Sequence, residues 1–186
     1  MVHADTVHVQ PDNGSIGCTD IHARRPRLAK VLTGGQSGVD RAATDVAIAC
    51  GVAYGGWVPR GGWAEDFPTP PGLLAAYPAF TETPSDDPAV RTIYNVDDAD
   101  GLLVLTLGSF GSPGTALALA RAAQRAIPSA SIDVRRAAAG RLLGDLAASL
   151  PPASTLNVAG PRESEEPGIY ASVRRFLEAH VGTLVG

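Results

Sequence analysis

Short apolar segments alternate with longer amphipathic segments along most of the chain, and this alternation restricts the folds available to it. Strands are expected at residues 28–33, 52–58, 101–107, 131–134 and 155–158. Helices are expected at residues 39–50, 86–98, 113–126, 137–150 and 167–181. Strands that alternate with helices pair in parallel, because each helix carries the chain back along the sheet. The pattern predicts an α/β protein with a doubly wound, mainly parallel, Rossmann-like sheet and helices on both faces.

Two segments support this prediction most clearly. In residues 39–50, apolar side chains recur every three or four positions, and Gly51 follows as a typical helix-ending glycine. Residues 101–107 are apolar on both faces, as in a central parallel strand. By contrast, residues 59–84 hold six of the 15 prolines, and we expect a long irregular loop there.

The composition is that of a folded domain. The chain has 186 residues, of which 45% are hydrophobic and 18% charged, a size typical of one domain and too apolar for a disordered chain. We expect residues 28–186 to form a single Rossmann-like ligand-binding domain. Residues 1–27 lack apolar periodicity, so we expect a flexible or extended N-terminal leader.

Several kinds of catalytic site are excluded by residue counts. No histidine lies between residues 23 and 179, so neither a Ser-His-Asp triad nor a zinc site of the His-Glu-x-x-His type can form in the expected core. The only lysine, Lys30, is not part of a phosphate-binding-loop motif. The two cysteines, Cys18 and Cys50, suffice neither for a disulfide framework nor for a cysteine metal site.

The net charge and the N-terminal sequence limit the kinds of partner and the cellular compartment that we expect. The net charge is −4, which speaks against nucleic acid or an anionic membrane as a partner. The N-terminus lacks a basic segment followed by an apolar core, so no secretory signal is expected. We therefore expect a cytoplasmic protein with a small-molecule ligand.

Four polar or glycine-rich loops follow predicted strands, at residues 34–38, 59–66, 108–115 and 159–164. Right-handed crossovers place the carboxyl ends of parallel strands at one edge of the sheet, where such folds bind ligands. Glycines allow close approach of the backbone, and helix N-termini after the first and third loops favour an anion. The pattern predicts an anion site at this edge.

The first loop has a second interpretation. Ser37, followed three residues later by Asp40, fits a capping box, and Arg41 and Asp45 could pair on the helix surface. Under this interpretation, the loop is a tight turn without a ligand.

Arg60, Arg91 and Arg162 are candidates to bind phosphate, although single arginines are often ordinary surface residues.

These same segments resemble the family of molybdenum cofactor carriers, within the LOG-like (lysine-decarboxylase-like) Rossmann proteins. The similarity runs from about Lys30 to Leu177, and its longest motifs are residues 34–45 and 156–164. Shorter matches lie at residues 55–61, 64–66, 77–78, 82–83, 91–92, 95–96, 98, 100 and 114–115. The resemblance implies a LOG-like fold that binds the molybdenum cofactor (a phosphorylated pterin) or molybdate, as a homo-oligomer.

The resemblance and the loops together give a set of candidate binding residues. We expect the loop glycines with Ser37 and Thr115 to bind phosphate, the arginines to neutralise charge, and Glu65 or Asp66 to contact ring N–H groups. The full set is Gly34, Gly35, Gln36, Ser37, Gly38, Asp40, Arg41, Arg60, Glu65, Asp66, Arg91, Thr92, Asn95, Gly114, Thr115, Gly160, Pro161, Arg162, Glu163 and Ser164. No metal-ligating residue is predicted.

The alternative is a LOG-like nucleotide-binding protein or nucleotide N-glycosidase. The phosphoribohydrolases of this group have a signature similar to PGGxGTxxE, and here Ala118 stands at the position of its glutamate. This substitution favours a carrier over an enzyme. If the protein is an enzyme, Glu65, Asp66 or Glu163 would be the working carboxylate.

Overall fold

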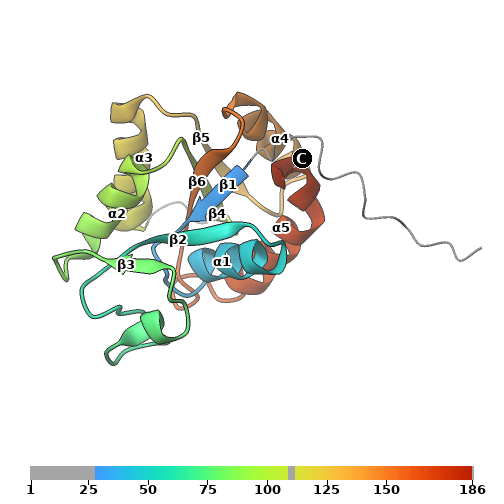
Figure 1. The fold of residues 1–186 in the computed structure, drawn as a ribbon. Helices are drawn as coiled ribbons and strands as arrows, with labels where there is room; N and C mark the ends of the chain where they lie inside the picture. The colour runs from blue at the N-terminus through green and yellow to red at the C-terminus, as the bar shows by residue number, and fades with distance from the viewer. Residues whose placement is uncertain (1–27, 109–111, 186) are drawn as a thin grey trace, which may run out of the picture.

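The computed structural model describes residues 28–108 and 112–185. Their strands form one parallel sheet in the order β3-β2-β1-β6-β4-β5 (Figure 1). The strands are β1 (Leu28–Leu32), β2 (Ala53–Val58), β3 (Phe80–Glu82), β4 (Gly101–Thr106), β5 (Ser129–Asp133) and β6 (Ser154–Ala159). This arrangement confirms the predicted doubly wound α/β fold.

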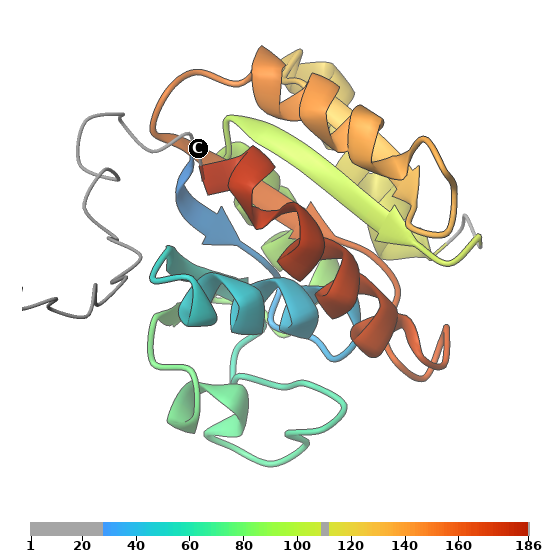
Figure 2. The ribbon, with the colours of Figure 1, turned by 90° about the vertical axis from the view of Figure 1, so that its right-hand side faces the viewer.

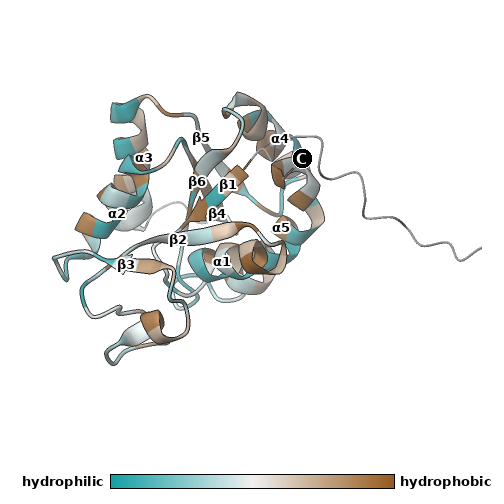
Figure 3. Cartoon of the chain, viewed as in Figure 1, coloured by the Kyte–Doolittle hydropathy of each residue, from teal (hydrophilic) through white to brown (hydrophobic). Residues whose placement is uncertain are grey.

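Helices cover both faces of the sheet. They are α1 (Val39–Ala49), α2 (Pro88–Asp97), α3 (Pro113–Arg125), α4 (Ala139–Ser149) and α5 (Ile169–Val185). Helices α1, α4 and α5 lie on one face and α2 and α3 on the other (Figures 1 and 2). Figure 3 shows hydrophilic residues along the outer side of α3. The predicted leader, residues 1–27, lies outside the described residues.

The direction of winding changes at the centre of the sheet. The chain runs outward from β1 through β2 to β3, crosses to β4 and β5, and returns to place β6 between β1 and β4. Right-handed crossovers require helices on opposite faces for movements in opposite directions, as observed. The carboxyl ends of β1, β6 and β4 therefore meet where the strand order reverses, which is the usual ligand position in such sheets.

Strand β4 lies between β6 and β5 and contributes to the cores on both faces of the sheet. All six of its residues are buried, with Leu103 and Leu105 packed toward α4 and α5, and Leu102 and Val104 toward α2 and α3. Because a buried parallel strand has two apolar faces, it reads as a continuous apolar run in the sequence. This is why its position was predicted correctly.

Residues 59–84 are more ordered than the irregular loop that the prolines predicted. They contain a short 3-10 helix, η1 (Gly72–Ala75), and strand β3, which pairs with β2 at the edge of the sheet. Leu73 and Phe80 are buried with Val58 in a small core of their own. Strand β3 has three residues, too few to show a period, so the packing and not the sequence pattern determines it.

None of the described helices is long and apolar enough to cross a membrane.

Candidate ligand-binding site

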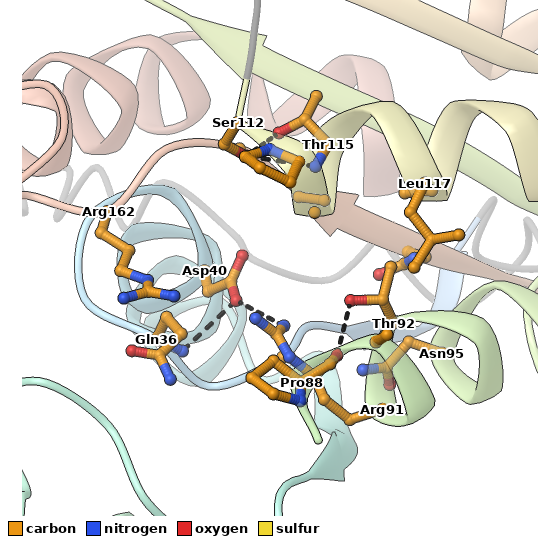
Figure 4. A pocket seen from close by; sticks show the side chains of 18 of the residues that line it. Gln36, Asp40, Pro88, Arg91, Thr92, Asn95, Ser112, Thr115, Leu117 and Arg162 are labelled. Carbon is orange, nitrogen blue, oxygen red and sulfur yellow. Dashed lines mark hydrogen bonds and ion pairs between the residues drawn. The ribbon is translucent and has the colours of Figure 1, made fainter.

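A cavity of about 420 Å³ opens at the carboxyl edge of the sheet, on the face that carries α2 and α3. Its walls come from the loops after β1 and β6, from β6 itself, and from the N-terminal parts of α2 and α3. Figure 4 shows Arg162, Gln36 and Asp40 on one side and Thr92, Asn95 and Leu117 on the other. The candidate residues that line this cavity are Gly34, Gln36, Asp40, Arg91, Thr92, Asn95, Gly114, Thr115, Gly160 and Arg162.

The other candidate residues lie elsewhere. A separate, more open hollow of about 830 Å³ is lined by Ser37, Gly38, Arg41, Glu65, Asp66, Glu163 and Ser164. Gly35 and Pro161 are buried, and Arg60 is exposed with its nearest carboxylate, Asp86, 4.0 Å away. The loops therefore converge on one edge, as expected, but their side chains are divided between two hollows.

The first loop already surrounds a carboxylate of the protein. Asp40, which is 4% exposed, accepts hydrogen bonds from the backbone N–H groups of Gln36, at 3.3 Å, and Gly34. Arg91 contacts the same carboxylate at 3.4 Å. Burial raises the pKa of Asp40, against the lowering effect of Arg91 and of the two amides. The amides that we expected to face a ligand anion therefore face Asp40.

The capping box predicted at Ser37 is wrong. Helix α1 has Gly38 at its N-cap position, with φ 72°, and no side chain caps it. A Cβ at Gly38 would lie 2.5 Å from the Pro161 carbonyl oxygen, so the close approach of the loop after β6 requires glycine. Ser37 instead donates to the Glu65 carboxylate and accepts from the Glu163 N–H, at 3.1 Å.

The predicted Arg41–Asp45 pair is also wrong. Arg41 contacts Asp66, with its Nη1 2.6 Å from a carboxylate oxygen, and donates to the Gly35 carbonyl at 3.2 Å. Asp45 accepts hydrogen bonds from the hydroxyls of two tyrosines, Tyr77 and Tyr170. Both side chains have partners distant in the sequence, which helical spacing alone does not reveal.

The three carboxylates named for an enzymatic role are held in the second hollow. Glu163 accepts from the backbone N–H groups of residues 168 and 170, at 2.6 and 3.0 Å, and Asp66 is paired with Arg41. Burial acts to raise the pKa of Glu65, but hydrogen bonds from Ser164 and Ser37 outweigh it and hold the pKa below its usual value. Each carboxylate thus has structural partners.

Two cavity residues from α2 are likewise engaged. The Asn95 side chain accepts from the Trp57 N–H at 2.7 Å and donates to the Trp57 carbonyl at 2.9 Å, which ties α2 to β2. Thr92 donates to the Pro88 carbonyl at 3.0 Å. Both residues shape the wall of the cavity through contacts within the protein.

The N-terminus of α3 forms the opposite wall. Ser112 is its N-cap, accepting from the Thr115 N–H at 3.1 Å, and the hydroxyls of the two residues lie 2.8 Å apart. Pro113 occupies the first helical position, as is common. The positive end of this helix dipole faces the cavity together with two hydroxyl groups.

Arg162 lines the cavity, and its charge contributes to the lowered pKa of Glu65, after the hydrogen bonds from Ser164 and Ser37. Its guanidinium lies 5.5 Å from the ring centroid of Trp63, a cation–π distance. It forms no ion pair with any carboxylate in residues 28–108 and 112–185. A positive charge held by an aromatic ring beside a cavity is suited to an anionic ligand.

Sequence reasoning missed Asn157, which lies on β6 and lines the cavity. Its neighbours Leu156 and Val158 face the opposite core, while Asn157 is 3% exposed on the α2 and α3 face. Its side-chain amide has no hydrogen-bond partner in the described part of the chain. An amide side chain between the apolar residues Leu156 and Val158 of the strand is the signal that could have identified it.

Among the described residues, no group of three or more His, Cys, Asp or Glu side chains is arranged to hold a metal ion.

Comparisons with known proteins agree with the fold and with the resemblance seen in the sequence. A model of the circularly permutated YpsA SLOG family (cpYpsA) matches residues 31–181. A crystal structure of a "putative molybdenum carrier protein" from Syntrophus aciditrophicus SB is similar, with a TM-score of 0.73 and 35% identity. The similarity covers 85% of this chain and 98% of that one. No curated protein matches.

The family match begins within β1, spans β2 to β6, and includes every loop at the carboxyl edge of the sheet. The LOG-like relationship predicted from the glycine-rich and Ala-Gly-Pro-Arg-Glu-Ser motifs is confirmed. The chain belongs to the circularly permutated YpsA SLOG family.

Proposed function

We propose that this protein is a molybdenum carrier that binds the molybdenum cofactor or molybdate in the 420 Å³ cavity. The observation that carries the proposal is Arg162, whose guanidinium lines the cavity without a carboxylate partner. The similarity to a structure described as a molybdenum carrier supports the identity of the cargo. Cavities of this volume are of the size that binds small molecules.

The wall of the cavity is suited to oxygen atoms that carry negative charge. Arg162 and Arg91 supply guanidinium groups, and the N-terminus of α3 supplies a dipole with the hydroxyls of Ser112 and Thr115. Guanidinium and hydroxyl groups bind phosphate or oxo oxygens through charge-assisted hydrogen bonds. The cargo would thus be held by its oxygens, and a pterin-bound metal would keep the ligands with which it arrives.

Arg91 differs from Arg162 because it is shared with Asp40. Their contact is 3.4 Å long, and the Arg91 Nε is buried without a hydrogen-bond partner. A ligand anion would compete with Asp40 for this guanidinium. Binding would therefore be weaker than two free arginines would provide, unless the Asp40 carboxyl, whose pKa is raised, takes up a proton.

Isothermal titration with molybdate and with the molybdenum cofactor tests the proposal. Charge-assisted hydrogen bonds contribute about 1.5–3 kcal/mol, so Arg162→Gln should weaken binding by about 10- to 100-fold. The matched control is Arg141→Gln, on α4, where the arginine is paired only with Asp145 at the surface. The proposal fails if neither compound binds, or if both variants bind equally well.

A nucleotide is the second candidate ligand, because the cavity lies where the strand order of a Rossmann-like sheet reverses. Ala118, at the position of the phosphoribohydrolase glutamate, is fully buried and lines the cavity. We therefore expect binding without cleavage. Incubation with nucleoside monophosphates, followed by chromatography for the free base, would show hydrolysis if this expectation is wrong.

A further inference from the structure

Two polar groups in residues that line the cavity have no hydrogen-bond partner among the described residues. Asn157 lines the cavity and is only 3% exposed, and its side-chain amide has no hydrogen bond to the described residues. The Nε of Arg91, another residue of the same wall, is also buried and unpartnered. Polar groups at such low exposure are nearly always hydrogen-bonded, so the Asn157 amide calls for a partner from a molecule in the cavity. The Arg91 Nε has almost no accessible surface and does not point to an occupant by itself.

The chemistry of Asn157 restricts what that occupant can be. A primary amide presents two N–H donors and a carbonyl acceptor, so it is satisfied only by a ligand that both accepts and donates. Molybdate and phosphate, when fully ionised, present acceptors alone, and they would leave the Asn157 carbonyl without a partner. A heterocycle with adjacent C=O and N–H groups, as in a pterin or guanine, would satisfy both halves of the amide.

Other parts of the cavity wall are suited to the faces of a ring. Leu117 and Ala118 of α3, Pro88 of α2, and Ala159 of β6 bring apolar groups to the cavity wall. The oxyanion-binding groups lie elsewhere on the wall, at Arg162 and the start of α3 (Figure 4). The cavity wall therefore combines apolar groups, which suit the faces of a ring, with Arg162 and the hydroxyls at the start of α3, which suit an oxyanion.

We infer that Asn157 is a specificity-determining residue that reads the lactam edge of a phosphorylated heterocycle, and that a bare oxyanion does not fill this site. The inference rests on the proposed function and deepens it, since it selects the ring-bearing cargo over molybdate. Arg162 and the α3 N-terminus hold the phosphate, while Asn157 accepts from and donates to the ring. A cargo that lacks the ring loses the second set of contacts.

Titration calorimetry with four probes tests the inference: sodium molybdate, ribose 5-phosphate, guanosine 5′-monophosphate and neopterin monophosphate. In the unmodified protein, at least one of the two ring compounds should bind tenfold or more tightly than molybdate and ribose 5-phosphate. Asn157→Leu, which keeps a similar volume, should remove this preference but leave the ribose 5-phosphate affinity unchanged. Asn157→Ser provides a second variant if leucine prevents folding, as judged by circular dichroism.

The matched control is Thr155→Val, which changes a polar residue two positions earlier on β6 and outside the cavity lining. It should retain the preference for the ring. If molybdate binds as tightly as both ring compounds, the inference fails while the carrier proposal stands. If Asn157→Leu weakens all probes equally, Asn157 is structural and the inference also fails. If no probe and no intact molybdenum cofactor binds, both proposals fail.

Discussion

The contact between Gly34 and Arg91 allows a sharp test of how the cavity is held together. A Cβ built at Gly34 would overlap the Arg91 guanidinium and would lie 3.0 Å from a carboxylate oxygen of Asp40. The φ of Gly34 is not in the left-handed region, so alanine suits the backbone there. Gly34→Ala should therefore displace the end of the Arg91 side chain and break its ion pair with Asp40.

The size of the effect follows from the environment of Asp40. Removing one partner of a buried ion pair costs about 3–5 kcal/mol when the other charge is left uncompensated. Here the amides of Gly34 and Gln36 still bind the carboxylate, and its raised pKa permits proton uptake. We therefore expect a loss near that of one charge-assisted hydrogen bond, about 2 kcal/mol. For a chain of this size, that corresponds to a fall in Tm of about 4–8 °C.

Urea unfolding of a double-mutant cycle measures this coupling. In an Arg91→Ala background, the guanidinium is absent, so Gly34→Ala should cost far less than in the unmodified chain. The control is Gly114→Ala on α3, where a Cβ would meet only the Ser112 Oγ at 3.9 Å. It should be neutral or stabilising by up to about 1 kcal/mol. Equal costs of Gly34→Ala in both backgrounds would refute the reasoning.

Three further predictions concern pH dependence, a pKa and a helix end. Burial raises the pKa of Asp40 in the folded protein above its value of about 3.9 in the unfolded chain. The contribution of Asp40 to the free energy of unfolding is therefore fully present below about pH 3.9, and it is lost as the pH rises through the folded-state pKa. Asp40→Asn should remove this decline. Urea unfolding at several pH values would then show the stability of the variant increasing, relative to that of the unmodified protein, as the pH rises. Ser164→Ala removes a hydroxyl donor 2.5 Å from Glu65; the pKa of Glu65 should rise toward its usual value in a ¹³C NMR titration, and an unchanged value would contradict the assigned hydrogen bond. Ala126 ends α3 with φ 53°, so Ala126→Gly should stabilise the protein by about 1 kcal/mol. The same change at Ala123, inside the helix, should destabilise the protein by a similar amount. If thermal unfolding shows that both substitutions change Tm in the same direction, the left-handed backbone at Ala126 is not the cause.

The candidate site was only partly predictable from sequence. Glycine-rich loops and apolar strands indicated the edge of the sheet at which the cavity opens, and Arg162 and Thr115 were both expected there. Asp40 was expected to cap a helix or to contact a ligand, but it binds the loop amides and Arg91. No local sequence pattern indicates whether those amides bind the Asp40 carboxylate or the anion of a ligand.

What the sequence determined by itself is the alternation of elements, the burial of β4 on both faces, and the convergence of the loops. Each of these features depends on apolar side chains that repeat every two to four residues, or on the fixed handedness of crossovers. Residues close together in the sequence are therefore enough to specify it. The tertiary structure alone decided how the loop side chains divide between two hollows and which polar groups remain without partners. Ser37, for example, binds the backbone of Glu163, 126 positions away. Such a contact is set by the packing of β6 beside β1 and by the close approach at Gly38, and packing across a sheet has no signature in a local pattern.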